Sequence, residues 1–182
     1  MDGMTTVIAP PASRRPAARS WRLGGRARKA VLTVHLLSGS GWIGIDIALG
    51  ILVITAFSTS DAAVAATSLR ALELFAVWPM FAMSVVCLLS GVVLGVGGKY
   101  GLVRYWWVAV KLAINVLMSA LIVTALRSGI GDAAETGARL AAGDDTALPT
   151  DLLYPVVVAP SLLSIAVVLS VVKPWGRLRR AG

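Results

Sequence analysis

The sequence predicts an all-α fold, a polytopic membrane protein with four transmembrane helices in a bundle and both termini in the cytoplasm. Three observations predict it. Apolar residues make up 57% of the 182-residue chain, and charged residues only 14%. A soluble domain of this length could not bury so much apolar surface in one core. The apolar residues also fall into four long runs, and the segments between those runs alternate between basic and non-basic.

Each apolar run is long enough to cross a bilayer. About 20 predominantly apolar residues in a helix span the hydrocarbon core. Backbone polar groups inside the membrane need partners within their own segment, which favours helices. The predicted spans, which together form a transmembrane domain of residues 31–172, are 31–57, 75–97, 105–126 and 152–172. Three prolines lie inside these runs, and we expect them to kink the helices rather than to end them. They are Pro79, Pro155 and Pro160.

The charged residues orient the spans. The segments before the first span, between the second and third, and after the fourth are basic, whereas the loops 58–74 and 127–151 carry more acids than bases. Because cytoplasmic loops carry the excess of Lys and Arg, we expect both termini in the cytoplasm and the protein in a bacterial cell (inner) membrane. The net charge of +8 then reflects this bias and an attraction to anionic lipid headgroups. No nucleic-acid partner is expected.

Two basic tails flank the membrane domain. Residues 1–30 are rich in Pro, Ala and Arg, a composition typical of disordered segments. Residues 173–182 form a second, shorter basic tail. The Gly- and Ala-rich acidic loop 127–151 could form a short surface helix, and we expect it to be the most variable and flexible part of the membrane domain.

The stretch HLLSGSGWIGID, residues 35–46, combines the only histidine of the chain with the pattern G-x-G-x-x-G. That pattern marks a dinucleotide site when it joins a strand to a helix. Here it lies inside one long apolar run, so a dinucleotide site is not expected. We interpret its glycines, together with Gly91 and Gly95 of the second span, as positions where another helix approaches closely.

Ionisable side chains inside a span are costly and usually functional. Three occur here, His35 and Asp46 in the first span and Lys111 in the third. Helical periodicity places His35, Trp42 and Asp46 on one face, and Lys111 and Asn115 on one face of the third span. Counted from the cytoplasmic ends, His35 and Lys111 lie at similar depths and would meet if their helices are neighbours. Two simpler interpretations stay open: Lys111 extends to the headgroups, and His35 makes an interhelical hydrogen bond.

A second candidate site lies on the second span. Met80, Met83 and Cys87 share one helical face and offer soft sulfur ligands, which suit copper. Packing is the commoner role of methionine in apolar helices. The single cysteine excludes an internal disulfide. No catalytic triad, zinc-ligand spacing or phosphate-binding loop occurs, so the sequence assigns no enzymatic activity.

Two longer segments carry a resemblance. The segment GVGGKYGLVRYWWVAVKLAINVLMSALIV, residues 95–123, and the first-span VHLLSGSGWIG resemble an uncharacterised integral-membrane family common in actinobacteria. The resemblance covers residues 31–126. More distantly, a histidine followed by W-x-G, and a V-K-L preceded by tryptophan, are similar to CopD-type copper-resistance proteins and HemJ-type protoporphyrinogen oxidases. The HemJ-type proteins are four-helix proteins that bind b-type haem.

This resemblance implies a functional pair. In the HemJ-type proteins it is a histidine of the first helix and a lysine of the third, which correspond to His35 and Lys111. The chain departs from that group because it has no second histidine, which excludes bis-histidine ligation of haem within one chain.

The sequence supports three functional hypotheses. The first is a protein that binds haem b or a porphyrin, with His35 as an axial ligand and Lys111 paired with a propionate or a porphyrin substrate. The second is a copper-handling permease that uses His35, Asp46 and the sulfur face of the second span. The third is a non-catalytic scaffold that assembles with another membrane protein or with copies of itself.

Overall fold

The computed structural model describes residues 23–98, 102 and 105–172. The predicted tail 173–182, and the predicted N-terminal tail up to residue 22, lie outside the described residues. Within them the chain forms helices and no strand. In order, the elements are α1 (Gly25–Ser58), α2 (Ala62–Phe75), α3 (Trp78–Val96), α4 (Trp106–Leu121), the π-helical turn η1 (Ile122–Leu126), α5 (Arg127–Ala141), the 3-10 turn η2 (Thr150–Leu152) and α6 (Leu153–Val172).

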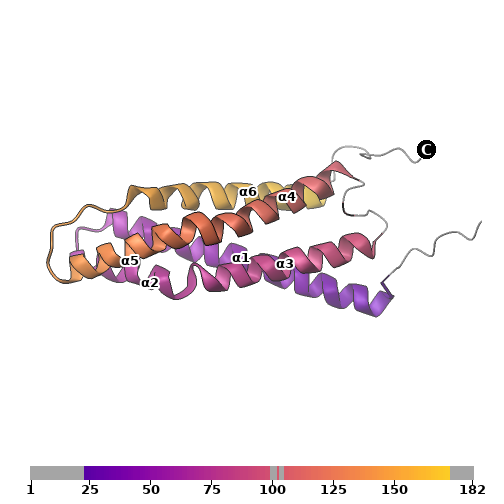
Figure 1. Cartoon of the computed structure of the whole chain (residues 1–182), viewed down its shortest axis with the longest axis horizontal. Helices are drawn as coiled ribbons and strands as arrows, with labels where there is room; N and C mark the ends of the chain where they lie inside the picture. The colour runs from indigo at the N-terminus through magenta and orange to yellow at the C-terminus, as the bar shows by residue number, and fades with distance from the viewer. Residues whose placement is uncertain (1–22, 99–101, 103–104, 173–182) are drawn as a thin grey trace, which may run out of the picture.

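Four helical rods in the described residues are long and apolar enough to cross a membrane: 25–58, 62–96, 106–141 and 150–172. The predicted all-α, multi-pass bundle of four helices is therefore confirmed. α2 and α3 form the second rod, and α4, η1 and α5 form the third (Figure 1). Both α1 and α4 pack against α3 and α6, so the spans enclose a common core. The start of α1 and the end of α6 lie at the same end of the bundle, as an even number of spans requires (Figure 1).

The helices extend beyond the predicted spans. α1 begins at Gly25 rather than at residue 31, α2 fills most of the predicted loop 58–74, and α5 fills the first part of the predicted loop 127–151. With 34 residues, α1 is about 51 Å long, well above the ~30 Å hydrocarbon core. We call the helical projection formed by α2, α5 and the end of α1 the distal cap. It lies at the end of the bundle opposite the start of α1 (Figure 1).

The local sequence explains α2. Asp61 caps its N-terminus, because the carboxylate accepts hydrogen bonds from the backbone N–H groups of Ala63 at 2.8 Å and Val64 at 3.4 Å. Alanine and leucine, both strong helix formers, dominate the body of the helix. The buried residues recur at helical spacing and form the stripe that packs on α5 and α1, which consists of Ala65, Ala66, Ser68, Leu69 and Leu72.

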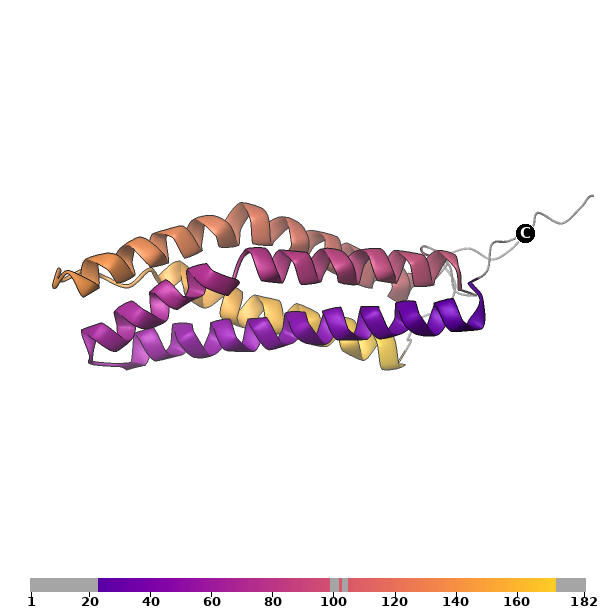
Figure 2. The same cartoon turned by 90° about the horizontal axis from the view of Figure 1, so that it is seen from below.

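A short turn at residues 76–77 separates α2 from α3 (Figure 2). Pro79 lies in the first turn of α3, where its missing N–H leaves no intrahelical hydrogen bond unmade. The expectation that Pro79 and Pro155 kink their helices from within is therefore wrong, since Pro155 also lies in the first turn of its helix, α6. Pro160 alone lies in a helix interior.

The third rod bends at the π-helical turn η1 (Figure 2). A single π-helical turn is a common cause of a helix bend and is frequent at functional sites. Close by, the Arg127 guanidinium lies 5.8 Å from the ring centroid of Trp78, which is largely exposed. Tryptophan and arginine collect at membrane interfaces. This pair lies where α3 and α5 begin, at the junction of the bundle with the distal cap.

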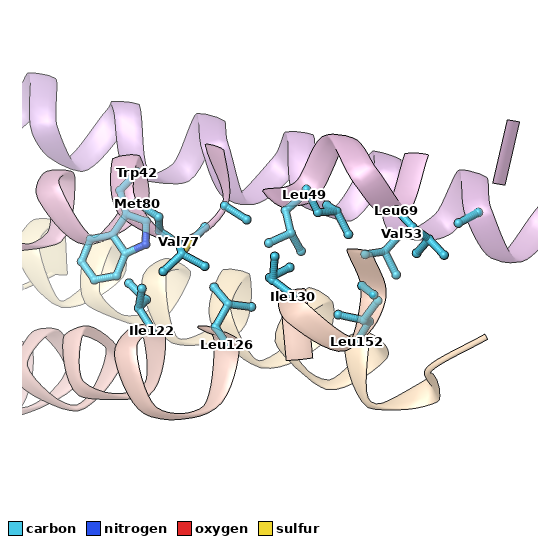
Figure 3. Packing of buried hydrophobic residues seen from close by; sticks show 14 of the residues in the cluster. Trp42, Leu49, Val53, Leu69, Val77, Met80, Ile122, Leu126, Ile130 and Leu152 are labelled. Carbon is cyan, nitrogen blue, oxygen red and sulfur yellow. The ribbon is translucent and has the colours of Figure 1, made fainter. Parts of the chain in front are cut away.

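The core runs along the inner face of α1, opposite the bent third rod. Figure 3 shows Trp42 at the level of Ile122, and Leu49 at the level of Ile130. Val53 and Leu69 continue the same apolar layer into the distal cap (Figure 3). The membrane span and the cap therefore share one hydrophobic core.

Two of the predicted glycine positions, Gly41 and Gly91, lie where α1 and α3 pack closely. A Cβ atom at Gly95 would instead meet Leu102, which lies outside the helices. A Cβ atom at Gly41 would lie 3.3 Å from Sδ of Met83, and one at Gly91 would lie 3.2 Å from Cε1 of His35. The G-x-G-x-x-G pattern lies inside α1 with no turn. Its last glycine, Gly44, faces open space and is not a contact position.

Gly137 of α5 lies where this helix packs against α2. A Cβ atom there would lie 2.9 Å from the backbone oxygen of Ala66 and 3.2 Å from Cβ of Leu69. Gly137→Ala is therefore expected to push α5 from α2 and to destabilise the protein by about 1–3 kcal/mol, less the ~1 kcal/mol that alanine gains in a helix. Thermal unfolding in detergent, followed by circular dichroism, measures this. Gly131→Ala on the same helix meets nothing within 4 Å and should stabilise the protein. Equal melting temperatures for the two variants would contradict the close contact of α2 with α5.

Candidate functional site

His35 is held against α3 by its Nδ1 atom. Nδ1 lies 3.0 Å from the backbone oxygen of Cys87 and 3.0 Å from Oγ of Ser90. A carbonyl oxygen can only accept, so Nδ1 carries the proton, and in the neutral ring Nε2 keeps its lone pair. The Ser90 hydroxyl donates to the backbone oxygen of Val86 at 2.6 Å and can accept from Nδ1. Two partners on α3 thus fix the ring and its tautomer.

The Cys87 thiol extends this polar contact towards α4. Its Sγ lies 3.7 Å from Nδ1 of His35, and it interacts with the side chains of Ser38 and Asn115. Asn115 shares a helix turn with Ser119, whose hydroxyl lies 2.8 Å from the backbone oxygen of Asn115. The predicted site residues His35, Cys87 and Asn115 therefore belong to one polar cluster that joins α1, α3 and α4.

Lys111 lies on α4 and contacts α6. Its Nζ donates a hydrogen bond to Oγ of Ser170 at 2.9 Å and lies 4.8 Å from the ring centroid of Trp107. An ammonium group over an indole face gains cation–π stabilisation. The charge of Lys111 is also within electrostatic range of His35 and Cys87. The structure thus places the cation near the polar cluster, with α6 as a direct partner that the sequence did not indicate.

Asp46 does not belong to the polar cluster. Together with Trp42 it lines a cavity of about 430 Å³ between α1, the third rod and α6. His35 and Lys111 are not among the lining residues. His35 and Asp46 share a helical face, but they are about 16 Å apart along α1. The predicted stripe of His35, Trp42 and Asp46 is therefore divided between the polar cluster and the cavity.

The three sulfur-bearing residues of α3 have three different surroundings. Met80 is buried in the core and lines the cavity, Met83 packs against Gly41, and Cys87 faces His35. In the part of the chain that the structure describes, no group of three or more His, Cys, Asp or Glu side chains could hold a metal ion. The three sulfur-bearing residues of the predicted face therefore have different neighbours, and that of Cys87 is His35.

Two acids of the cavity lie in the segment that the sequence predicts as a loop. Asp132 lies on α5 and Asp151 on η2, and both line the cavity from exposed positions. The short surface helix that the sequence allowed in this segment is present, as α5. Its buried residues are Ile130, Ala133 and Gly137, and their spacing on one helical face is the signal that could have shown it.

The chain was compared with protein-family models, curated proteins and solved structures, and nothing matches. The family resemblances in the sequence therefore stay hypotheses.

Proposed function

We propose that the protein binds haem b or a related porphyrin through His35, at an intramembrane redox site. The observation that carries this proposal is the 3.0 Å contact between Nδ1 of His35 and the backbone oxygen of Cys87. Histidines that bind a metal usually donate their other ring N–H to a carbonyl or carboxylate, which fixes the tautomer and orients the ring. His35 has this arrangement before any metal is bound, and its Nε2 is the nitrogen suited to ligation.

The polar cluster can supply one axial ligand to a haem iron. His35 supplies an imidazole nitrogen, and Lys111 supplies a cation at a similar depth that could pair with a propionate. Haem would contribute one-electron chemistry. The protein would hold the imidazole, and it would keep the site away from bulk water between α1, α3 and α4.

The proposed setting is a bacterial inner membrane with both termini in the cytoplasm. The basic segments support this orientation, since Lys and Arg favour the cytoplasmic side. His35 lies in the half of α1 that is nearer its start, so the site would lie in the cytoplasmic half of the bilayer. The distal cap would then project from the outer surface of that membrane.

A second candidate function is copper handling, and one observation favours it. Sγ of Cys87 lies 3.7 Å from Nδ1 of His35, so a small movement would bring a soft sulfur and an imidazole nitrogen onto one ion. Thiolate and thioether sulfur select Cu(I). This function would break the hydrogen bond from Nδ1 to the Cys87 carbonyl, whereas haem ligation through Nε2 would keep it.

The absorption spectrum of the purified protein tests these proposals. We expect protein solubilised in detergent, from cells grown with ample haem precursor, to show a Soret band and to contain iron. A colourless protein that retains copper, measured by elemental analysis, would favour the permease. A colourless protein without metal would leave the role of a non-catalytic membrane partner.

A further inference from the structure

The cavity of about 430 Å³ lies at the membrane end of the distal cap and has no part in the proposed haem site. We propose that it binds an amphiphilic organic cation, a protonated amine carried on an apolar body, with Asp46 as the counter-ion. The volume falls within the range of small-molecule sites, about 300–1,000 Å³. The π-helical turn η1 contributes Ile122, Ala125 and Leu126 to the wall, and such turns are frequent at functional sites.

The carboxylate of Asp46 indicates that the ligand is positively charged. The Asp46 side chain lines the cavity, and the residue is only 5% exposed. A carboxylate that faces a largely apolar cavity is costly unless a counter-charge occupies the cavity, and inside a membrane the cost is greater. Trp42 and Leu49 flank Asp46 on α1, and Figure 3 shows them at the levels of Ile122 and Ile130. Asp46 therefore lies level with the start of α5, in a cavity that exposed residues of α5 and η2 also line, so a cation could reach it from water.

The rest of the lining indicates an organic cation rather than a metal ion. A hard metal ion takes about six or more oxygen ligands, whereas the walls around Asp46 are largely apolar and include Leu49, Met80 and Met118. No metal-binding group of three acids, cysteines or histidines occurs among the described residues. An amine with a hydrocarbon body fits this lining, because its ammonium group can pair with Asp46 while its apolar part packs against the apolar walls. Trp42 offers an indole face in the same wall, and indoles attract ammonium groups.

The exposed end of the cavity favours entry of the same ligand. Asp132 and Asp151 line the cavity from exposed positions, and Tyr154 lies beside them. Acids around an entrance raise the local concentration of cations and speed association. A cationic amphiphile would therefore be drawn from the aqueous side of the distal cap towards Asp46, while its apolar part takes the place of water against the core.

Calorimetric titration with 4-phenylbutylamine tests this proposal. The full-length protein in nanodiscs is titrated with the amine, with neutral 4-phenylbutanol and with anionic 4-phenylbutyrate, and empty nanodiscs correct for partition into lipid. We expect saturable binding of the amine only. Asp46→Asn keeps the shape of the side chain and removes its charge, and it should weaken binding at least about 10-fold. Asp145→Asn removes the same charge from an exposed loop position outside the cavity and should bind like the wild type.

A second variant tests the same cavity independently, in case Asp46→Asn does not fold. Ala159→Phe narrows the cavity from α6 and leaves Asp46 in place, and it should also lose the amine if the ligand occupies this space. Circular dichroism and gel filtration show whether each variant is folded. The proposal is overturned if the wild type binds no amine, if the alcohol binds as tightly as the amine, or if either folded variant, Asp46→Asn or Ala159→Phe, binds like the wild type.

Discussion

His35→Ala is expected to abolish the Soret absorbance of the protein completely, with no loss of yield or helicity. The chain contains no other imidazole that could take over as the axial ligand. Alanine suits an apolar helix, and the half-buried ring packs against α3, through Cys87, Ser90 and Gly91. The measurement is the absorbance spectrum of wild type and variant, purified in parallel from cells supplied with haem precursor, with circular dichroism to confirm the fold.

Ser90→Ala is the matched control on the facing helix. It removes one of the two partners of Nδ1 but leaves the Cys87 backbone oxygen at 3.0 Å, which is sufficient to fix the tautomer. This variant should keep most of its haem. If the wild type is pigmented and His35→Ala keeps all of its pigment, the axial-ligand role is wrong. His35 would then be what the simpler interpretation holds, a hydrogen-bond partner between α1 and α3.

The membrane-spanning architecture was predictable because a bilayer leaves the backbone few choices. A run of apolar residues such as 152–172 has to become a helix if it is to satisfy its own backbone polar groups, and the structure has a helix there. Of the distal cap, the sequence indicated only a possible short helix within 127–151, where α5 lies. It did not indicate α2, because a short helix between two spans resembles a loop on a hydropathy scale. For α2, Asp61 followed by a helical stripe of alanine and leucine was a visible signal that hydropathy alone ignores.

The candidate residues could be predicted from the sequence, but not their partners. His35, Asp46 and Lys111 are conspicuous because ionisable side chains are rare within spans. Their partners depend on how each helix is rotated and how far it is shifted along its neighbour, and one sequence does not report either quantity. The hydrogen bond from His35 goes to a backbone oxygen, which every residue possesses. The separation of Asp46 from His35 follows from the different helices that α1 meets along its length.

Leu69→Ala is expected to loosen the distal cap by about 2–5 kcal/mol, the usual cost of removing a fully buried leucine side chain. Leu69 is 0% exposed and lies beside Gly137 of α5, where α2 and α5 are closest. Because α2 packs mainly on α5 and the end of α1, and little on α3, the loss should be local. Amide hydrogen exchange in nanodiscs, measured by mass spectrometry on peptides from α2, should lose about 30-fold or more of its protection, since 1.4 kcal/mol corresponds to about a factor of 10.

Leu74→Ala supplies the control for that measurement, because it makes the same chemical change on the same helix at a position that is 82% exposed. It should alter protection by less than about 0.5 kcal/mol.

The stability of the distal cap also affects the cavity, since α5 carries Asp132 at the exposed end and Ile130 in the shared core. If the cap holds the entrance in shape, Leu69→Ala should slow or weaken amine binding while the protection of α3 stays unchanged. Equal exchange in Leu69→Ala and Leu74→Ala would mean that α2 does not pack on α5 in the membrane, and the cavity would then lack the wall that α5 provides.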